Sequence, residues 1–156
     1  MGEVKEGRMN LSEYGEVASQ CWHDLPRHYL SCSLDSFVIM PNHVHGIVVI
    51  NNEKMVGNGL KPFPTFDLSE IIRGFKTFSS RRINEMVKGS ERFQWQKSFY
   101  DHVIRDERSL NNLRQYIQNN PLKWELDMEN QEKKVEGSVS SSGNCTEYYK
   151  KIIKGD

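Results

Sequence analysis

The sequence predicts an α+β domain in which helices pack on antiparallel strands. Two apolar runs, at residues 34–40 and 43–50, are separated by the turn signal Pro41-Asn42, a pattern typical of a β-hairpin. Apolar residues also recur at helical spacing in three stretches, one before the hairpin and two after it. The chain has 156 residues, the usual length of one domain, and it can bury a sizeable core.

Each predicted helix has its own boundary signals. The first begins at the capping-box pattern of residues 10–13 and stops before Pro26. The second begins at another capping box, residues 67–70, and carries a long apolar stripe. The third begins at Asp106 and ends at residues 119–121, because proline lacks an amide donor and restricts the residue before it.

A third strand and a polar tail complete the prediction. Residues 93–105 are rich in aromatic and β-branched side chains, which indicates a strand. Beyond residue 125 the chain becomes polar, and residues 137–144 have the composition of a flexible linker. We therefore expect one structured domain over residues 1–130 and a flexible polar tail over residues 131–156.

Composition argues against a membrane or disulfide-rich protein. No apolar run approaches the ~20 residues of a membrane-spanning helix, and the first residues do not form a secretory signal. We therefore expect a cytoplasmic protein with no membrane partner. The three cysteines, Cys21, Cys32 and Cys145, lack zinc-site spacing and the density of a disulfide scaffold, so we interpret them as incidental thiols.

The net charge of zero conceals a basic middle region. Between residues 71 and 124, eleven Lys and Arg stand against five Asp and Glu, a net charge of +6. In the predicted second helix, Arg73, Lys76 and Arg81 lie mostly away from the apolar stripe and are our candidate DNA contacts. Such a face fits a phosphate backbone, but it fits an ordinary solvated surface equally well. Charge alone leaves both interpretations open.

Two histidines stand one residue apart at the start of the strand predicted over residues 43–50. Alternate side chains of a strand project from the same face, so the imidazoles of His43 and His45 can reach one metal ion. The same pattern is typical of two structural histidines whose hydrogen bonds are satisfied at a strand entrance. The spacing alone does not choose between these interpretations.

In the third predicted helix, Tyr116 and Asn120 are four residues apart. If the helix persists, both project from nearly one face and place a hydroxyl nucleophile beside an amide oxygen able to bind a cation. Because Asn120 precedes Pro121, its side chain can instead cap the helix end. The spacing of this pair is therefore weak support for a site.

Several motifs follow one another in a characteristic order. They are Pro41-Asn42-His43-Val44-His45, Phe75-Lys76, Trp95-Gln96, Phe99-Tyr100-Asp101-His102-Val103-Ile104-Arg105 and Tyr116-Ile117-Gln118-Asn119-Asn120-Pro121. Together they resemble the single-tyrosine transposases of the HUH nuclease superfamily, and within it the group called REP-associated tyrosine transposases. The resemblance covers about residues 2–130, and the ordered set is far more specific than the two histidines alone.

The resemblance implies a ferredoxin-like antiparallel sheet with helices packed on it. It also implies cleavage and rejoining of single-stranded or hairpin DNA, by a monomer or homodimer, without nucleotide hydrolysis. Carried over by motif, His43, His45 and Asn120 would bind a divalent cation, Mg or Mn. Tyr116 would be the catalytic nucleophile that forms a 5′-phosphotyrosine link and leaves a free 3′-hydroxyl.

The chain departs from the family at its first residues. Relatives usually carry an aromatic-rich strand ahead of the first helix, and residues 1–4 stand about where that strand has ended, so we expect the sheet to lack it. Two alternatives to an active transposase therefore remain open: a truncated, inactive relative that only binds nucleic acid, and a structural metal-binding domain with phosphodiesterase activity or none. His102 is left unassigned, and the other tyrosines, Tyr14, Tyr29, Tyr100, Tyr148 and Tyr149, suit packing or lie past the linker.

Overall fold

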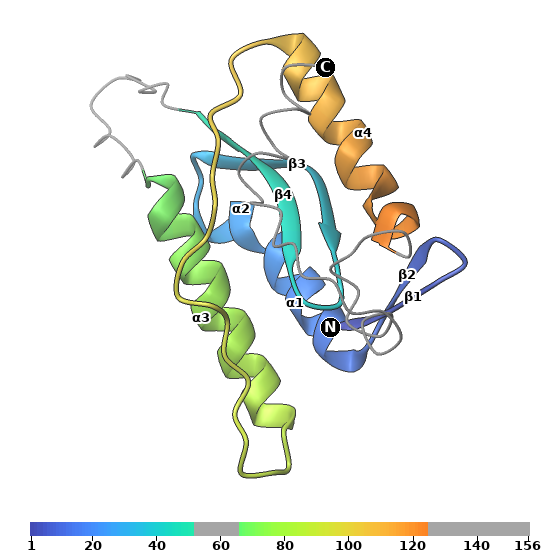
Figure 1. The fold of residues 1–156 in the computed structure, drawn as a ribbon. Helices are drawn as coiled ribbons and strands as arrows, with labels where there is room; N and C mark the ends of the chain where they lie inside the picture. The colour runs from blue at the N-terminus through green and yellow to red at the C-terminus, as the bar shows by residue number, and fades with distance from the viewer. Residues whose placement is uncertain (52–65, 125–156) are drawn as a thin grey trace, which may run out of the picture.

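The computed structural model describes residues 1–51 and 66–124, and this part of the chain has an α+β fold (Figure 1). The predicted fold class is therefore confirmed. In chain order the elements are β1 (Gly2–Lys5), β2 (Arg8–Leu11), α1 (Glu13–His23), α2 (Leu25–His28), β3 (Cys32–Ile39), β4 (Val44–Ile50), α3 (Leu68–Met86) and α4 (Glu107–Trp124). The predicted tail, residues 131–156, lies outside the described residues, as do the last residues of the predicted domain.

The predicted hairpin is present and forms the centre of the fold. Strands β3 and β4 pair antiparallel, from Cys32 opposite Ile50 to Ile39 opposite Val44. The Met40 amide donates to the His43 carbonyl at 2.8 Å and closes the turn. The register is irregular between Leu34 and Phe37, so β3 bends there.

Alternation along β4 sends its side chains to two different layers. Val44, Val48 and Ile50 pack against a core formed with α1, α2 and α3, whereas Ile47 packs against Leu113 of α4 on the opposite face. In Figure 1 the hairpin accordingly lies between α4 on one side and α1 with α3 on the other. This period-two pattern also places His45 on the α4 face.

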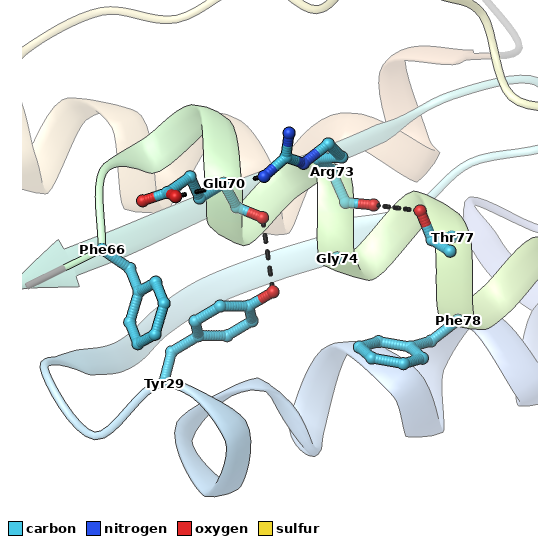
Figure 2. Close-up of a pocket in the computed structure, with 7 residues that line it drawn as sticks. All are labelled: Tyr29, Phe66, Glu70, Arg73, Gly74, Thr77 and Phe78. Carbon is cyan, nitrogen blue, oxygen red and sulfur yellow. Dashed lines mark hydrogen bonds and ion pairs between the residues drawn. The ribbon is translucent and has the colours of Figure 1, made fainter. Parts of the chain in front are cut away.

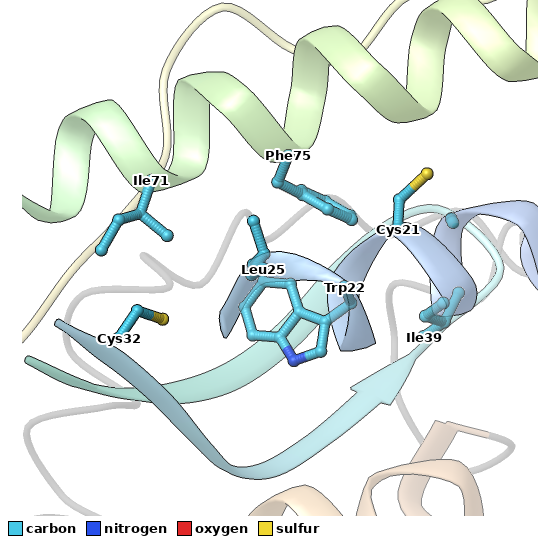
Figure 3. Close-up of a cluster of buried hydrophobic side chains, with 8 residues drawn as sticks. Cys21, Trp22, Leu25, Cys32, Ile39, Ile71 and Phe75 are labelled. Atoms are coloured by element: carbon cyan, nitrogen blue, oxygen red, sulfur yellow. The ribbon is translucent and has the colours of Figure 1, made fainter. Parts of the chain in front are cut away.

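The main core fills the face of the hairpin that α1, α2 and α3 cover (Figure 3). Trp22 lies at its centre, stacked on Phe37 at 5.8 Å between ring centroids and edge-on to Phe75 at 5.2 Å. The indole lies so close to Gly46 of β4 that a Cβ atom there would stand 2.3 Å from Trp22 Cζ2. Glycine at position 46 is therefore a condition for this packing.

Two helices begin at side-chain caps. At α3 the predicted capping box is confirmed: the Glu70 amide donates to Asp67 Oδ1 at 2.8 Å, and the Asp67 amide donates to Glu70 Oε2 at 3.2 Å. At α1 the cap is Ser12, whose hydroxyl oxygen accepts from the Gly15 amide at 3.3 Å. The first helix therefore begins two residues later than the capping-box pattern predicted.

The strand predicted over residues 93–105 is absent from the structure, and this prediction was wrong. The segment instead runs along α3, whose side chains bind its backbone. Lys76 Nζ donates to the carbonyls of Gln96 and Ser98 at 2.8 and 2.9 Å, and Asn84 both donates to and accepts from the Phe93 backbone. Side chains of α3 thus bind backbone groups that a neighbouring strand would otherwise pair with.

We predicted that the third helix ends at residues 119–121, and this prediction was wrong. Helix α4 continues through Pro121 to Trp124. The proline leaves the Ile117 carbonyl without its usual amide donor, a change that costs about 3 kcal/mol in a helix interior. Pro121 and Trp124 are both buried, and their burial offsets this cost. Consequently Asn120 lies inside the helix and does not serve as its terminal residue.

Two strands precede α1, in a stretch where we predicted none. β1 and β2 pair with each other and form a sheet separate from β3–β4. Their turn uses Glu6 and Gly7, whose φ angles of 52° and 68° are those of a tight hairpin turn. The turn packs on α4, because a Cβ atom at Gly7 would stand 2.6 Å from the Leu122 side chain.

Candidate cation and nucleophile site

The two histidines of the turn and of β4 converge. Nε2 of His43 lies 2.9 Å from Nε2 of His45, and the ring centroids are 4.5 Å apart. A cation held at roughly 2.1 Å by two ligands at a right angle would set those ligands about 3 Å apart. The separation of the two nitrogens is therefore compatible with a shared cation, which remains a prediction.

A neighbouring amide orients the first imidazole. Nδ1 of His43 is hydrogen-bonded to Oδ1 of Asn42, the residue immediately before it. An amide oxygen can only accept, so Nδ1 carries the proton and a neutral imidazole then keeps the lone pair of Nε2. Nε2 is the nitrogen that faces His45. Asn42 thus prepares His43 to donate its lone pair to a ligand.

Burial keeps the second imidazole neutral. The pKa of His45 falls from 6.5 to about 3, mainly because burial removes water from the charged form and to a smaller extent because His43 lies nearby. At neutral pH His45 is therefore unprotonated. Protonation of His45 does not compete with a cation in that range.

Three residues of α4 form a stripe opposite the histidines. The Tyr116 ring lies 5.3 Å from the His45 ring, and the Trp124 ring lies 5.8 Å from the His43 ring, measured between centroids. Asn120 is four residues from both Tyr116 and Trp124 on α4, so it lies between them on the same helix face. Its side chain belongs to a residue only 7% exposed. The stripe thus brings the predicted tyrosine, the predicted amide ligand and both histidines to one place.

Side-chain types limit what can complete a cation site. Within residues 1–51 and 66–124, no third His, Cys, Asp or Glu joins His43 and His45 in a cluster. The amide of Asn120 is the coordinating group that α4 places on the stripe facing them. Two imidazoles, an amide oxygen and remaining open positions suit Mg or Mn, which retain water and phosphate oxygens as ligands.

The nucleophile candidate is half-buried against a small apolar cluster. Ile47, Leu113 and Ile117 form this cluster, and Tyr116 packs at its edge. Lys123 Nζ lies over the Tyr116 ring, 5.6 Å from its centroid. The tyrosine ring therefore contacts both an imidazole and an ammonium group.

An ion pair fixes α4 on the hairpin. Arg114 Nε donates to Asp35 Oδ1 at 2.9 Å, and its Nη2 donates to Oδ2 at 2.6 Å. The hydrogen bond from Arg114 is the main reason that the pKa of Asp35 falls from 3.8 to about 2. Asp35 lies in the irregular stretch of β3. The irregular stretch of β3 thus supplies the carboxylate acceptor for Arg114, which stands two residues before Tyr116 on α4.

Sequence reasoning missed Asn42, Asp35, Arg114, Lys123 and Trp124. For the last two a signal existed: residues 123 and 124 stand seven and eight positions after Tyr116, which is about two helical turns. We overlooked it because we ended the helix at Pro121. The bidentate pair of Asp35 and Arg114 joins residues 79 positions apart and has no local signature.

The predicted DNA contacts, Arg73, Lys76 and Arg81, lie on α3, whereas the candidate site is formed by α4 and the start of β4. Arg73 and Arg81 have largely exposed side chains and pair with Glu70 and Glu85 at 4.0 and 3.5 Å. Lys76 directs its ammonium to the backbone of the segment beside α3, as described above. The structure therefore does not bring these three cations together with the histidines.

A cavity of about 210 Å³ also lies on the α3 side, below Gly74 (Figure 2). Tyr29 enters it from the end of α2 and donates its hydroxyl to the Glu70 carbonyl at 3.3 Å. The other lining residues are Phe66, Glu70, Arg73, Gly74, Thr77 and Phe78. None of the site residues on the α4 face lines this cavity.

Comparison with known proteins identifies the class. The family described as "Transposase IS200 like" matches residues 15–120, which include both histidines, Tyr116 and Asn120. An uncharacterized protein of Haemophilus influenzae is 36% identical over 135 residues, covering 81% of this chain and 74% of that protein. No solved structure matches.

These matches define a transposase, a class of enzyme that processes DNA. The chain belongs to the IS200-like transposase family. No helix among the described residues is long and apolar enough to cross a membrane.

Proposed function

We propose that this protein is a REP-associated tyrosine transposase that cleaves and rejoins single-stranded or hairpin DNA through Tyr116. The observation that carries the proposal is the contact between two layers: His45 of β4 packs against Tyr116 of α4 while its Nε2 meets Nε2 of His43. A nucleophile is thus adjacent to a cation-binding pair, an arrangement that a purely structural histidine pair does not require.

The proposed reaction exchanges one phosphodiester for another. Tyr116 Oη loses its proton and bonds to the scissile phosphorus, while the bond from phosphorus to the 3′-oxygen breaks. The 3′-oxygen leaves with a proton as a free hydroxyl, and the 5′ end stays joined to Tyr116. Attack by a 3′-hydroxyl on this link reverses the exchange, so rejoining needs no nucleotide hydrolysis.

The phenol needs assistance, because its usual pKa of about 10 makes it a weak nucleophile at neutral pH. His43, His45 and Asn120 would hold a divalent cation, Mg or Mn. When bound, that cation draws negative charge from the scissile phosphate and stabilises the transition state. The apolar cluster of Ile47, Leu113 and Ile117 holds the ring of Tyr116 in place beside these ligands.

A covalent-adduct assay tests the proposal. We expect the protein, mixed with a labelled hairpin oligonucleotide with single-stranded flanks and Mn²⁺, to form an adduct that survives denaturing electrophoresis. Removal of Mn²⁺ with EDTA and the substitution Tyr116→Phe should each abolish it. Tyr14→Phe is the matched control, because it makes the same chemical change on α1, across the hairpin from α4. An undiminished adduct in Tyr116→Phe would contradict the proposal.

A further inference from the structure

The ammonium of Lys123 lies over the ring of Tyr116, the ring that also contacts His45. Its Nζ is 5.6 Å from the centroid of the Tyr116 ring. Seven residues separate the two positions, which is nearly two full turns, so both lie on the same face of α4. Side chains on a helix lean toward its N-terminus, and the four-carbon stem of Lys123 therefore reaches back toward Tyr116.

Lys123 differs from its neighbour in exposure. Trp124 is 9% exposed and packs beside His43, whereas Lys123 is exposed to solvent. None of the ion pairs among residues 1–51 and 66–124 includes Lys123. The ammonium therefore stands at the open edge of the site, with its charge uncompensated by the acidic groups of the described residues.

An exposed contact between an ammonium and an aromatic ring contributes only about 0.5 to 1 kcal/mol, so it does not by itself require lysine at this position. A phosphodiester has a clearer use for the charge. When DNA reaches Tyr116, its phosphate adds a negative charge beside the phenol, and Lys123 is the cation that α4 places over that phenol.

We propose that Lys123 is a substrate-binding residue whose ammonium binds a non-bridging oxygen of the phosphate attacked by Tyr116. This inference rests on the proposed function and adds a phosphate contact from the helix that bears the nucleophile. The ligand class is a single-stranded phosphodiester held between the cation-binding pair and Lys123. The same contact holds the charge of the phosphotyrosine link after the strand is cut.

Binding can be tested without cleavage, in the Tyr116→Phe background, with the labelled hairpin oligonucleotide described above. One phosphate contact to a single strand contributes a slope of about 0.7 to the dependence of log K on log salt. Its loss in Lys123→Met should therefore lower the slope by that amount and weaken binding about fivefold at 0.1 M salt. Lys123→Arg should retain both. Lys88→Met, at an exposed position beyond the end of α3, is the control with the same charge change.

The rate of the covalent step then locates the contact. At saturating DNA, Lys123→Met with Tyr116 intact should form adduct at least tenfold more slowly than the wild-type protein, and Lys123→Arg should restore most of the rate. Weakened binding with an unchanged rate at saturation would place Lys123 on a remote phosphate and overturn the inference. Unchanged affinity and salt slope would overturn it as well.

The two measurements separate this inference from the proposed function. If the wild-type protein forms no adduct, the proposed function fails, whereas the affinity series in the Tyr116→Phe background still decides whether Lys123 binds phosphate. If adduct forms and the Lys123 variants match the wild-type residue in affinity, salt slope and rate, the proposed function stands and the role of Lys123 is rejected. Near-ultraviolet circular dichroism of each variant checks that α4 is still packed.

Discussion

The two faces of the β3–β4 hairpin are built differently. On the face covered by α1, α2 and α3, eight buried residues form one apolar cluster around Trp22. On the α4 face, the buried cluster has three members, Ile47, Leu113 and Ile117. Val38, Ile104 and Leu110 pack at the edge of this cluster, and the same face carries polar groups: two histidines, a tyrosine, a buried asparagine and a bidentate ion pair.

This difference separates stability from chemistry within one small sheet. Burial of apolar surface dominates the free energy of folding, so the face around Trp22 supplies most of the stability. The α4 face has a smaller apolar cluster because several of its positions carry polar side chains, which we propose bind the cation and attack DNA. We therefore expect substitutions on the first face to unfold the protein and substitutions on the second to remove function with smaller changes in stability.

The largest effect is expected at Trp22. The substitution Trp22→Ala removes the side chain that contacts both Phe37 and Phe75, and it should lower the free energy of unfolding by on the order of 3 to 5 kcal/mol. Urea unfolding followed by circular dichroism measures this change. Val49→Ala, on the α4 side of β4 and 41% exposed, is the control and should cost well under 1 kcal/mol. Equal decreases in the free energy of unfolding for Trp22→Ala and Val49→Ala would contradict the claim that the face around Trp22 supplies most of the stability.

The next effect is expected at Ile117, the residue after the proposed nucleophile Tyr116. Ile117→Ala opens a gap in a cluster of only three buried residues, and it should lower the free energy of unfolding by about 2 kcal/mol. Because this cluster positions the Tyr116 ring, adduct formation should fall by a larger factor than the folded fraction does. Retention of full cleavage in folded Ile117→Ala would show that α4 is positioned by other contacts.

The ion pair of Asp35 and Arg114 gives a pH-dependent effect. The pKa of Asp35 is about 2 in the folded protein against 3.8 for the free group, so its contribution is complete above about pH 4. That contribution disappears as the pH falls toward 2. With an allowance for partial exposure, we expect it to be about 1 kcal/mol. Asp35→Asn should therefore destabilise the protein at pH 7 and converge with the wild type near pH 2.

The smallest effect on stability is expected at the histidines. His45→Ala removes a half-buried imidazole that belongs to neither buried apolar cluster, so the free energy of unfolding should change by less than about 1 kcal/mol. Binding of Mn²⁺, followed by the electron paramagnetic resonance signal of the free ion, should nevertheless weaken at least tenfold. His102→Ala is the control, at an exposed histidine. Equal Mn²⁺ binding by both variants would remove the cation site from the α4 face.

The sequence predicted this contrast where local rules decide the structure. Strand alternation placed Val44, Val48 and Ile50 opposite Ile47, and the structure packs them in separate clusters. The capping box at Asp67 fixed the start of α3 within one residue. His43 and His45 converge as predicted, although His43 lies in the turn just before β4 and not within the strand.

The prediction failed where distant contacts override local preference. Pro121 is a strong local signal for a helix end, yet burial of Pro121 and Trp124 keeps the helix intact. Residues 93–105 have the composition of a strand, but Lys76 and Asn84 of α3 bind their backbone. The hairpin at residues 2–11 has few apolar side chains, so its pairing was not visible in the periodicity.

Mapping the attachment site of DNA tests the central claim most directly. The adduct formed with the hairpin oligonucleotide and Mn²⁺ is digested with protease and nuclease, and the modified peptide is sequenced by mass spectrometry. We expect a 5′-phosphate-linked nucleotide on the peptide that contains Tyr116, and a free 3′-hydroxyl on the released strand. A nucleotide attached to any other residue would contradict the assignment of the α4 face as the catalytic site.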